Sequence, residues 1–180
     1  DNRLYLRKMI FNSYKKSFED INKIIDNKNI QKFICNIDKN LKLIGITYTG
    51  KVFNLDWESN INNDHKLDNK SLGNIDPNEI INFHSIKKEI KNYLCILNSD
   101  GRFKKVLFDK NMINSNRSFA ITKLKNNTKT IDSFISNEEK NLTILTSIGR
   151  IFKFNLSDEF LAPTSKQSQG LILTKLLPTE

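Results

Sequence analysis

The feature that most constrains the fold is an internal repeat of about 50 residues. One pattern recurs at residues 43–55, 94–106 and 142–154. It consists of an apolar run, a short turn ending in glycine, a base and a second apolar run. The glycines, Gly50, Gly101 and Gly149, are 51 and 48 residues apart. Repeats of this length are typical of propellers and solenoids, in which each unit buries its apolar surface against its neighbours.

Two further phrases keep the same period. Ile-x-x-Phe occurs at Ile30/Phe33, Ile80/Phe83 and Ile131/Phe134, with spacings of 50 and 51 residues. A weaker phrase, typified by Ile-Thr-Lys-Leu, occupies residues 21–24, 72–75, 121–124 and 173–176. Three phrases in one order with one period indicate a true repeat.

The glycine phrase predicts a β-hairpin, because short β-branched runs flank a turn in which glycine tolerates a positive φ. The apolar residues Val52, Phe53 and Leu55 do not alternate, which is typical of strands covered on both faces. The other two phrases supply two more short strands. We therefore predict one repeat-built, all-β domain fragment of propeller-like blades with about four antiparallel strands each, at 1–60, 61–112 and 113–160, with a further blade starting at 161–180.

The N-terminal part allows two interpretations. Phe11, Tyr14 and Phe18 have helical spacing, so residues 11–27 could form an amphipathic helix. The repeat instead favours a strand near residues 18–24. The chain also opens in mid-pattern without an initiator methionine, so we expect it to be part of a longer protein.

The charge balance favours an anionic partner. The chain has 29 Lys and Arg against 20 Asp and Glu, which gives a formal charge of +9. Such a surface suits nucleic acid or an acidic membrane face, although a lysine-rich proteome would also produce it. No apolar run reaches about 18 residues, so no membrane span is predicted.

The sequence offers no catalytic or metal-binding constellation. Cys35 and Cys95 lie in apolar runs, which predicts buried free thiols in a reducing compartment. No Cys/His cluster has zinc-ligand spacing. His65 and His84 lack triad partners, and His84 falls within a predicted strand, so we interpret it as an edge residue or a satisfied core residue.

The candidate binding residues are bases that recur in the repeat, so that equivalent positions share one rim and form a curved basic stripe. Such a stripe would bind duplex DNA mainly through phosphates, without reading sequence. The alternative is that these are solvated charges beside turns. The predicted DNA-binding residues are Lys51, Arg102, Lys104, Lys105, Arg117, Arg150, Lys153 and Lys166, and the predicted structural turn residues are Gly50, Gly101, Gly149 and Gly170.

Residues 142–154 read Leu-x-x-x-Thr-x-x-Gly-Arg-x-x-x-Phe. This pattern resembles the blade motif of the C-terminal domain of bacterial DNA gyrase A and of its topoisomerase IV counterpart. The similarity continues through residues 157–161 and 166–173, where Gly170 stands at the family's turn, and it is strongest over 90–180.

The resemblance implies a β-pinwheel, with strand exchange between blades and DNA bent around a basic outer rim. Lys104 and Lys105 match the family's basic pair and Lys153 one member of it, whereas the first repeat has Phe53 and Asn54 there. The glycine-rich basic box that marks gyrase is absent, so the resemblance leaves gyrase and topoisomerase IV open.

The resemblance also implies partners. These are duplex DNA, the rest of a topoisomerase polypeptide of the gyrase A type, and the separate ATPase subunit of the gyrase B type, in the cytoplasm, nucleoid or an organelle. The parent enzyme would use ATP and Mg²⁺ through other parts, with no cofactor and no catalytic residue in this chain. The alternatives are a propeller that serves as a protein-interaction scaffold without binding DNA, and a small hydrolase-like propeller, for which the repeat supplies no converging acids or histidines.

Overall fold

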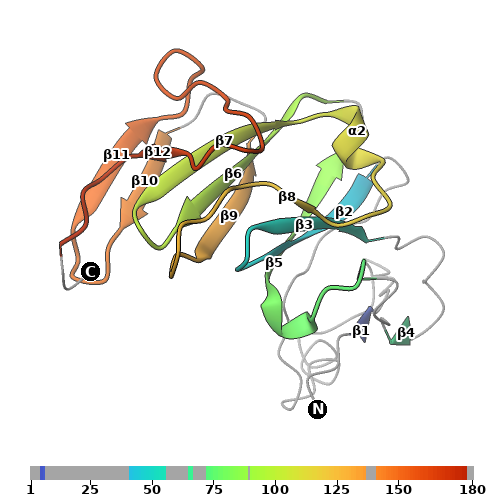
Figure 1. Cartoon of the computed structure of the whole chain (residues 1–180). Coiled ribbons are helices and arrows are strands. Elements are labelled where there is room, and N and C mark those ends of the chain that lie inside the picture. Colours follow the sequence, from blue (N-terminus) through green and yellow to red (C-terminus); the bar gives the residue numbers. More distant parts are fainter. Residues whose placement is uncertain are drawn as a thin grey trace, which may run out of the picture.

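The computed structural model describes residues 5–6, 41–55, 65–66, 72–88, 90–136 and 141–177. Regular structure in these residues is almost entirely β, arranged in two four-stranded and two two-stranded antiparallel sheets (Figure 1). The elements are β1 (Tyr5–Leu6), β2 (Leu41–Thr47), β3 (Lys51–Leu55), β4 (His65–Lys66), η1 (Pro77–Glu79), β5 (Ile80–Lys87), β6 (Asn92–Asn98), β7 (Arg102–Phe108), α2 (Lys110–Ile113), β8 (Phe119–Ala120), β9 (Thr130–Ser136), β10 (Asn141–Leu145), β11 (Ile151–Asn155) and β12 (Leu171–Ile172).

The first four-stranded sheet is built around the β2–β3 hairpin and has the strand order β5-β2-β3-β8. Strand β5 pairs with the outer edge of β2. Strand β8 pairs with β3 through Lys51 opposite Ala120 and Val52 opposite Phe119. The sheet is therefore completed by residues that follow the next hairpin in sequence.

The second four-stranded sheet repeats this arrangement one period later, with the order β12-β7-β6-β9. Leu171 and Ile172 of β12 stand opposite Phe103 and Arg102 of β7. We call β8 and β12 the exchange strands, because each closes a sheet whose hairpin lies one repeat earlier. The third hairpin, β10–β11, forms a two-stranded sheet of its own, at the left of Figure 1.

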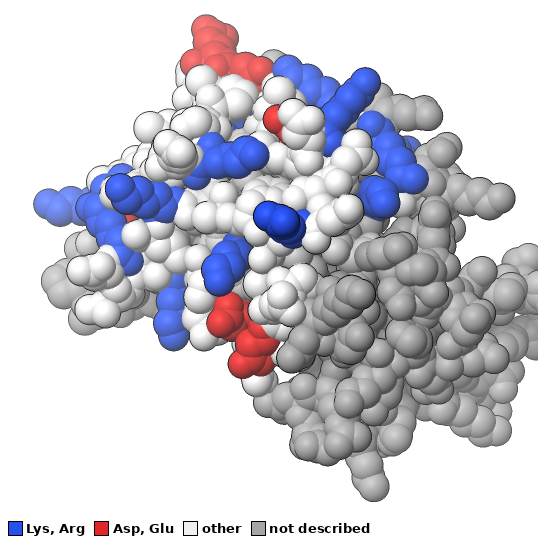
Figure 2. Space-filling view, turned by 45° about the vertical axis from the view of Figure 1, so that its right-hand side comes forward, with Lys and Arg blue, Asp and Glu red and all other residues white. Residues whose placement is uncertain are grey.

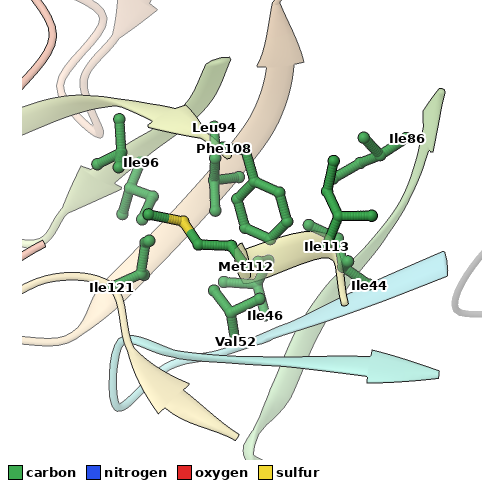
Figure 3. Packing of buried hydrophobic residues seen from close by; sticks show 11 residues of the cluster. Ile44, Ile46, Val52, Ile86, Leu94, Ile96, Phe108, Met112, Ile113 and Ile121 are labelled. Carbon is green, nitrogen blue, oxygen red and sulfur yellow. The ribbon is translucent and has the colours of Figure 1, made fainter. Parts of the chain in front are cut away.

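The main core lies between the two four-stranded sheets (Figure 3). Ile44, Ile46 and Val52 of the first sheet pack with Leu94 and Ile96 of the second. Phe108 at the end of β7 and the later residues Met112, Ile113 and Ile121 belong to the same cluster. Each fully buried aliphatic side chain stabilises the fold by about 1.5–3 kcal/mol, so this cluster joins the two sheets into one body.

The broken alternation in β3 has a direct cause. Val52 points into the core between the sheets, while Phe53 and Leu55 pack on the opposite face with Leu43 and Phe83. Both faces of the sheet are thus covered, as the sequence predicts. A Cβ on Gly45 would overlap the ring of Phe53, so the cross-strand partner of this phenylalanine has to be glycine.

The prediction of an all-β fold with four-stranded antiparallel sheets is confirmed. The prediction of strands at 72–75, 121–124 and 173–176 is wrong, because these segments are turns or irregular backbone. Their apolar residues are nevertheless buried, as Leu72 and Ile121 show, and the actual short strands β8 and β12 precede the phrase directly.

Sheets and sequence repeats are different units in this fold. The first sheet combines residues 41–55, 80–87 and 119–120, and so draws on three of the blade ranges expected from the sequence. The choice between helix and strand for residues 11–27 lies outside the described residues, as does Cys35.

Candidate nucleic-acid interface

The predicted turn glycines have positive φ, with values of 75° at Gly50, 74° at Gly101, 84° at Gly149 and 83° at Gly170. In each of the three hairpins, the turn places a base at the start of the second strand or directly before it: Lys51, Arg102 and Arg150. The exchange strands determine what lies beside these bases.

Around Lys51, the exchange segment of the first sheet lies directly against the Gly50 turn. We use this term for an exchange strand together with the residues that directly follow it. The N–H of Ile121 donates to the carbonyl of Gly50 at 2.9 Å. Two residues further on, the N–H of Lys123 donates to the carbonyl of Ser168 at 3.2 Å. The exchange segment of the first sheet is therefore bonded to the loop that leads into the exchange strand of the second.

The same path continues to the other two turns. Lys166 lies with its Nζ 5.2 Å from the centre of the Phe119 ring in β8. Arg102 donates to the carbonyl of Gly170 at 3.3 Å and pairs with Asp100 at 3.1 Å. Arg150 donates to the carbonyl of Lys175 at 3.2 Å, which brings the third turn against the end of the same segment.

These contacts define a continuous strip of bases, which we call the exchange rim. Its four lysines are exposed, while its two arginines are half-buried at the turns. Its members are Lys51, Arg102, Lys123, Arg150, Lys166 and Lys175. The face shown in Figure 2 carries lysine and arginine side chains in a broad band, with acidic side chains mainly toward its upper and lower margins.

Lys104 and Lys105 do not belong to this surface, and their burial argues against the predicted contact with DNA. Their exposed fractions are 1% and 4%. The reason is that β7 is covered on both faces, so a basic pair in this strand points inward whichever face each residue occupies.

Lys104 fastens the loop before β12. Its Nζ donates to the carbonyls of Lys166 and Ser168, each at 2.8 Å. Burial disfavours the charged ammonium and lowers the pKa of Lys104 to about 8. Lys104 thus positions the backbone that carries Lys166 without facing solvent itself.

Lys105 fastens the turn after β11. Its Nζ donates to the carbonyl of Leu156 at 2.5 Å and to Oδ1 of Asp158 at 2.6 Å, and lies 4.4 Å from the Tyr93 ring centre. The hydroxyl of Tyr93 donates to the other oxygen of Asp158. Hydrogen bonds from Lys105 and then Tyr93 lower the pKa of Asp158.

The first repeat explains why this position need not be basic. Asn54, four residues after its turn glycine like Lys105, donates from Nδ2 to the carbonyls of Met112, Ile113 and Ser115. In both four-stranded sheets, the side chain at this position donates hydrogen bonds to carbonyl groups of the turn that leads toward the exchange strand. Lys153 has the same place in the third hairpin, where its side chain is exposed.

The remaining predicted bases are accessible. Arg117, just before β8, is exposed, as is Lys166 before β12. The sequence does not lead us to predict Lys123 and Lys175 as binding residues. A sequence signal for them exists, because both stand at the lysine of the recurring Ile-Thr-Lys-Leu phrase, but the apolar residues of this phrase suggest a strand.

His84 and Cys95 have structural environments. His84 is half-buried on the edge strand β5, its Nε2 lies 2.8 Å from Oγ of Ser133, and burial lowers its pKa, which agrees with a hydrogen-bonded edge residue. Cys95 is buried and free, and burial raises its thiol pKa to about 12.

Within the described ranges, no group of three metal-ligand side chains is found. No helix among those residues is long and apolar enough to cross a membrane.

Comparison with solved structures supports the fold. The chain matches the DNA gyrase A C-terminal domain with a TM-score of 0.60 and 17% identity, covering 79% of this chain and 46% of that one. It matches the C-terminal domain of DNA topoisomerase IV with a TM-score of 0.61 and 17% identity, covering 74% and 42%. It matches the E. coli ParC C-terminal domain with a TM-score of 0.60 and 17% identity, covering 78% and 56%.

The chain therefore has the fold of these C-terminal domains, as the sequence resemblance predicts, and spans about half the length of each. No protein-family model and no curated protein matches it.

Proposed function

We propose that this chain is a DNA-wrapping module, which binds duplex DNA without sequence preference along the exchange rim. The observation that carries the proposal is the continuity of the rim. Backbone hydrogen bonds lead from the Gly50 turn through Lys123 to Ser168, and further contacts reach the Gly101 and Gly149 turns. A duplex presents one negative charge per about 1.7 Å of its axis, so it favours an extended row of cations over a single pocket.

The rim suits backbone recognition better than base readout. Its exposed bases are all lysines, flexible point charges that reach phosphates, whereas Arg102 and Arg150 already donate to backbone carbonyls. Lysines that neutralise phosphates release counterions and carry no sequence information. The fold shared with the gyrase A and topoisomerase IV domains supports the same function.

In this proposal the chain belongs to the gyrase A-type polypeptide of a type IIA topoisomerase. Its partners are the remainder of that polypeptide and the ATPase subunit of the gyrase B type, and other domains use ATP and Mg²⁺ for strand passage. DNA held on the rim would set how strand passage changes supercoiling. The chain itself contributes no reacting group, and it works in the cytoplasm, on the nucleoid or in the equivalent organelle.

The test is the salt dependence of duplex binding, measured by fluorescence anisotropy with a random-sequence fragment. Each phosphate contact contributes about 0.9 to the slope of log K against log salt. The double variant Lys123→Ser/Lys166→Ser is therefore expected to lower the slope by about 1.8. A duplex labelled at both ends and long enough to wrap should also show increased energy transfer when bound.

The matched control removes two exposed bases at the strand ends that lie away from the hairpin turns. Lys87 ends β5 and stands opposite Leu41 at the start of β2, and Lys110 follows the end of β7. Lys87→Ser/Lys110→Ser should leave the slope nearly unchanged. Equal slopes for the two double variants, or no binding by the folded protein at low salt, would contradict a rim-specific interface.

A further inference from the structure

The strand β12 places two large apolar side chains on the surface of the exchange rim. Leu171 is 47% exposed and Ile172 is 59% exposed. As consecutive residues of a strand, they point to opposite faces of the sheet. Both remain accessible because β12 is an edge strand, in the order β12-β7-β6-β9. We call this pair the aliphatic edge.

Bases of the exchange rim surround the aliphatic edge. Ile172 stands opposite Arg102 in the strand pairing, and Arg102 donates to the carbonyl of Gly170, the residue before β12. The exposed lysines Lys166 and Lys175 precede and follow the strand. A duplex whose phosphates are bound by these bases would therefore also lie against the two aliphatic side chains.

Packing within the fold does not require large exposed side chains at these positions. The equivalent strand of the first sheet, β8, has Ala120 at the position of Ile172. Ala120 is also exposed, so a single methyl group is enough to complete this edge of a sheet. At the position of Leu171, β8 has Phe119, which is half-buried because it packs on the main core. The exposed aliphatic surface is therefore particular to β12.

The chemistry of the minor groove decides which duplex such an edge accepts. Proteins that bind the minor groove of DNA often place aliphatic side chains in it. The sugars that line this groove in DNA have no 2′-hydroxyl, whereas an RNA duplex displays a 2′-hydroxyl from every nucleotide there. An aliphatic side chain pressed against such a hydroxyl removes its water without offering a hydrogen bond, which costs free energy. An aliphatic edge therefore suits DNA and disfavours RNA.

We propose that Leu171 and Ile172 contact the sugars of the minor groove and make the exchange rim select duplex DNA over duplex RNA. The inference rests on the proposed function, because the bases of the rim must first hold the duplex. These bases bind phosphates, which both nucleic acids share, and they set the salt dependence. The aliphatic edge adds an apolar contact that only DNA completes, and it reads no base, so the selection is independent of sequence.

The test compares DNA and RNA duplexes of one random sequence, both too short to wrap, by fluorescence anisotropy at several salt concentrations. Short duplexes keep the cost of bending, which differs between the two helices, out of the comparison. The parent protein is expected to bind the DNA duplex about tenfold more tightly than the RNA duplex, from the apolar area that the aliphatic edge buries on DNA alone. The two salt slopes should be similar, because the same lysines bind phosphates in both complexes.

The variant Leu171→Thr/Ile172→Thr removes the aliphatic surface and keeps residues that suit a strand. Its affinity for DNA should fall about tenfold, its affinity for RNA should not fall, and its salt slope should not change, since no phosphate contact is lost. The matched control is Ile90→Thr/Leu107→Thr. It changes an isoleucine and a leucine that are each 41% exposed and lie at strand ends away from the turns, and it should bind both duplexes as the parent protein does. Thermal melts check that both variants are folded.

Two outcomes would overturn the inference and leave the proposed function in place. The first is equal affinity of the parent protein for the DNA and RNA duplexes. The second is a preference for DNA that Leu171→Thr/Ile172→Thr retains, which would assign the selection to another part of the rim. Failure of the proposed function looks different, because the folded protein would then bind neither duplex at low salt, and the inference would fall with it.

Discussion

Replacing Lys105 by methionine separates a structural role from a DNA-binding one. The substitution keeps most of the side-chain volume but removes the ammonium that binds Leu156 and Asp158. A buried carbonyl left without its donor costs about 1–3 kcal/mol. The contact with Asp158, whose side chain is 47% exposed, is screened by solvent and adds little.

The expected loss in the free energy of unfolding is thus about 2 kcal/mol, which lowers Tm by roughly 4–8 °C for a chain of this size. Urea denaturation measures the first quantity and a thermal melt the second. The slope of DNA binding against salt should not change, because Lys105 does not reach the surface.

The matched control is Lys153→Met, at the same repeat position in the third hairpin. Its side chain is exposed, so stability should change by no more than about 0.5 kcal/mol. The reasoning is refuted if Lys105→Met is as stable as the parent protein while its salt slope falls by about 0.9, the value for one lost phosphate contact.

Three further predictions concern other buried positions. Gly101→Ala and Gly149→Ala share the cost of a positive φ, but Gly101→Ala should lose at least about 1 kcal/mol more in urea denaturation, because its methyl group would press on Thr174. Lys104 binds its proton more weakly when folded, so its contribution to unfolding free energy should rise as pH increases from about 8 to 10.5, and Lys104→Met should remove that rise. Cys95 should resist alkylation at pH 8 in the native protein, as measured by mass spectrometry, and react once urea unfolds the chain, because burial holds its pKa near 12.

The repeat makes much of the architecture predictable from sequence. The hairpins follow from local chemistry, because the apolar runs and turn glycines specify β2–β3, β6–β7 and β10–β11 directly. Strand exchange depends on long-range pairing. The two-residue strands β8 and β12 carry no periodicity that could reveal them, and the Ile-Thr-Lys-Leu phrase beside them resembles a strand in sequence because its apolar residues are buried.

The candidate site is less predictable, for a physical reason. A run of bases in a strand does not reveal whether both faces of that strand are covered, so Lys104 and Lys105 cannot be told from surface lysines by sequence. The polar Asn54 at the equivalent position is the available clue. A position that tolerates both asparagine and lysine is better explained by hydrogen bonding to carbonyls than by attraction to phosphate.

The exchange strands also change how the domain can lose or gain its parts. Because β8 closes the sheet of the preceding hairpin, deleting the repeat that carries β8 would remove one hairpin and expose the edge of another. The stability of each unit therefore depends on its neighbour in sequence, so that unfolding of one unit destabilises the adjacent one. Duplication of the unit would preserve the fold only in whole periods, with each new copy passing its exchange strand back to the one before it.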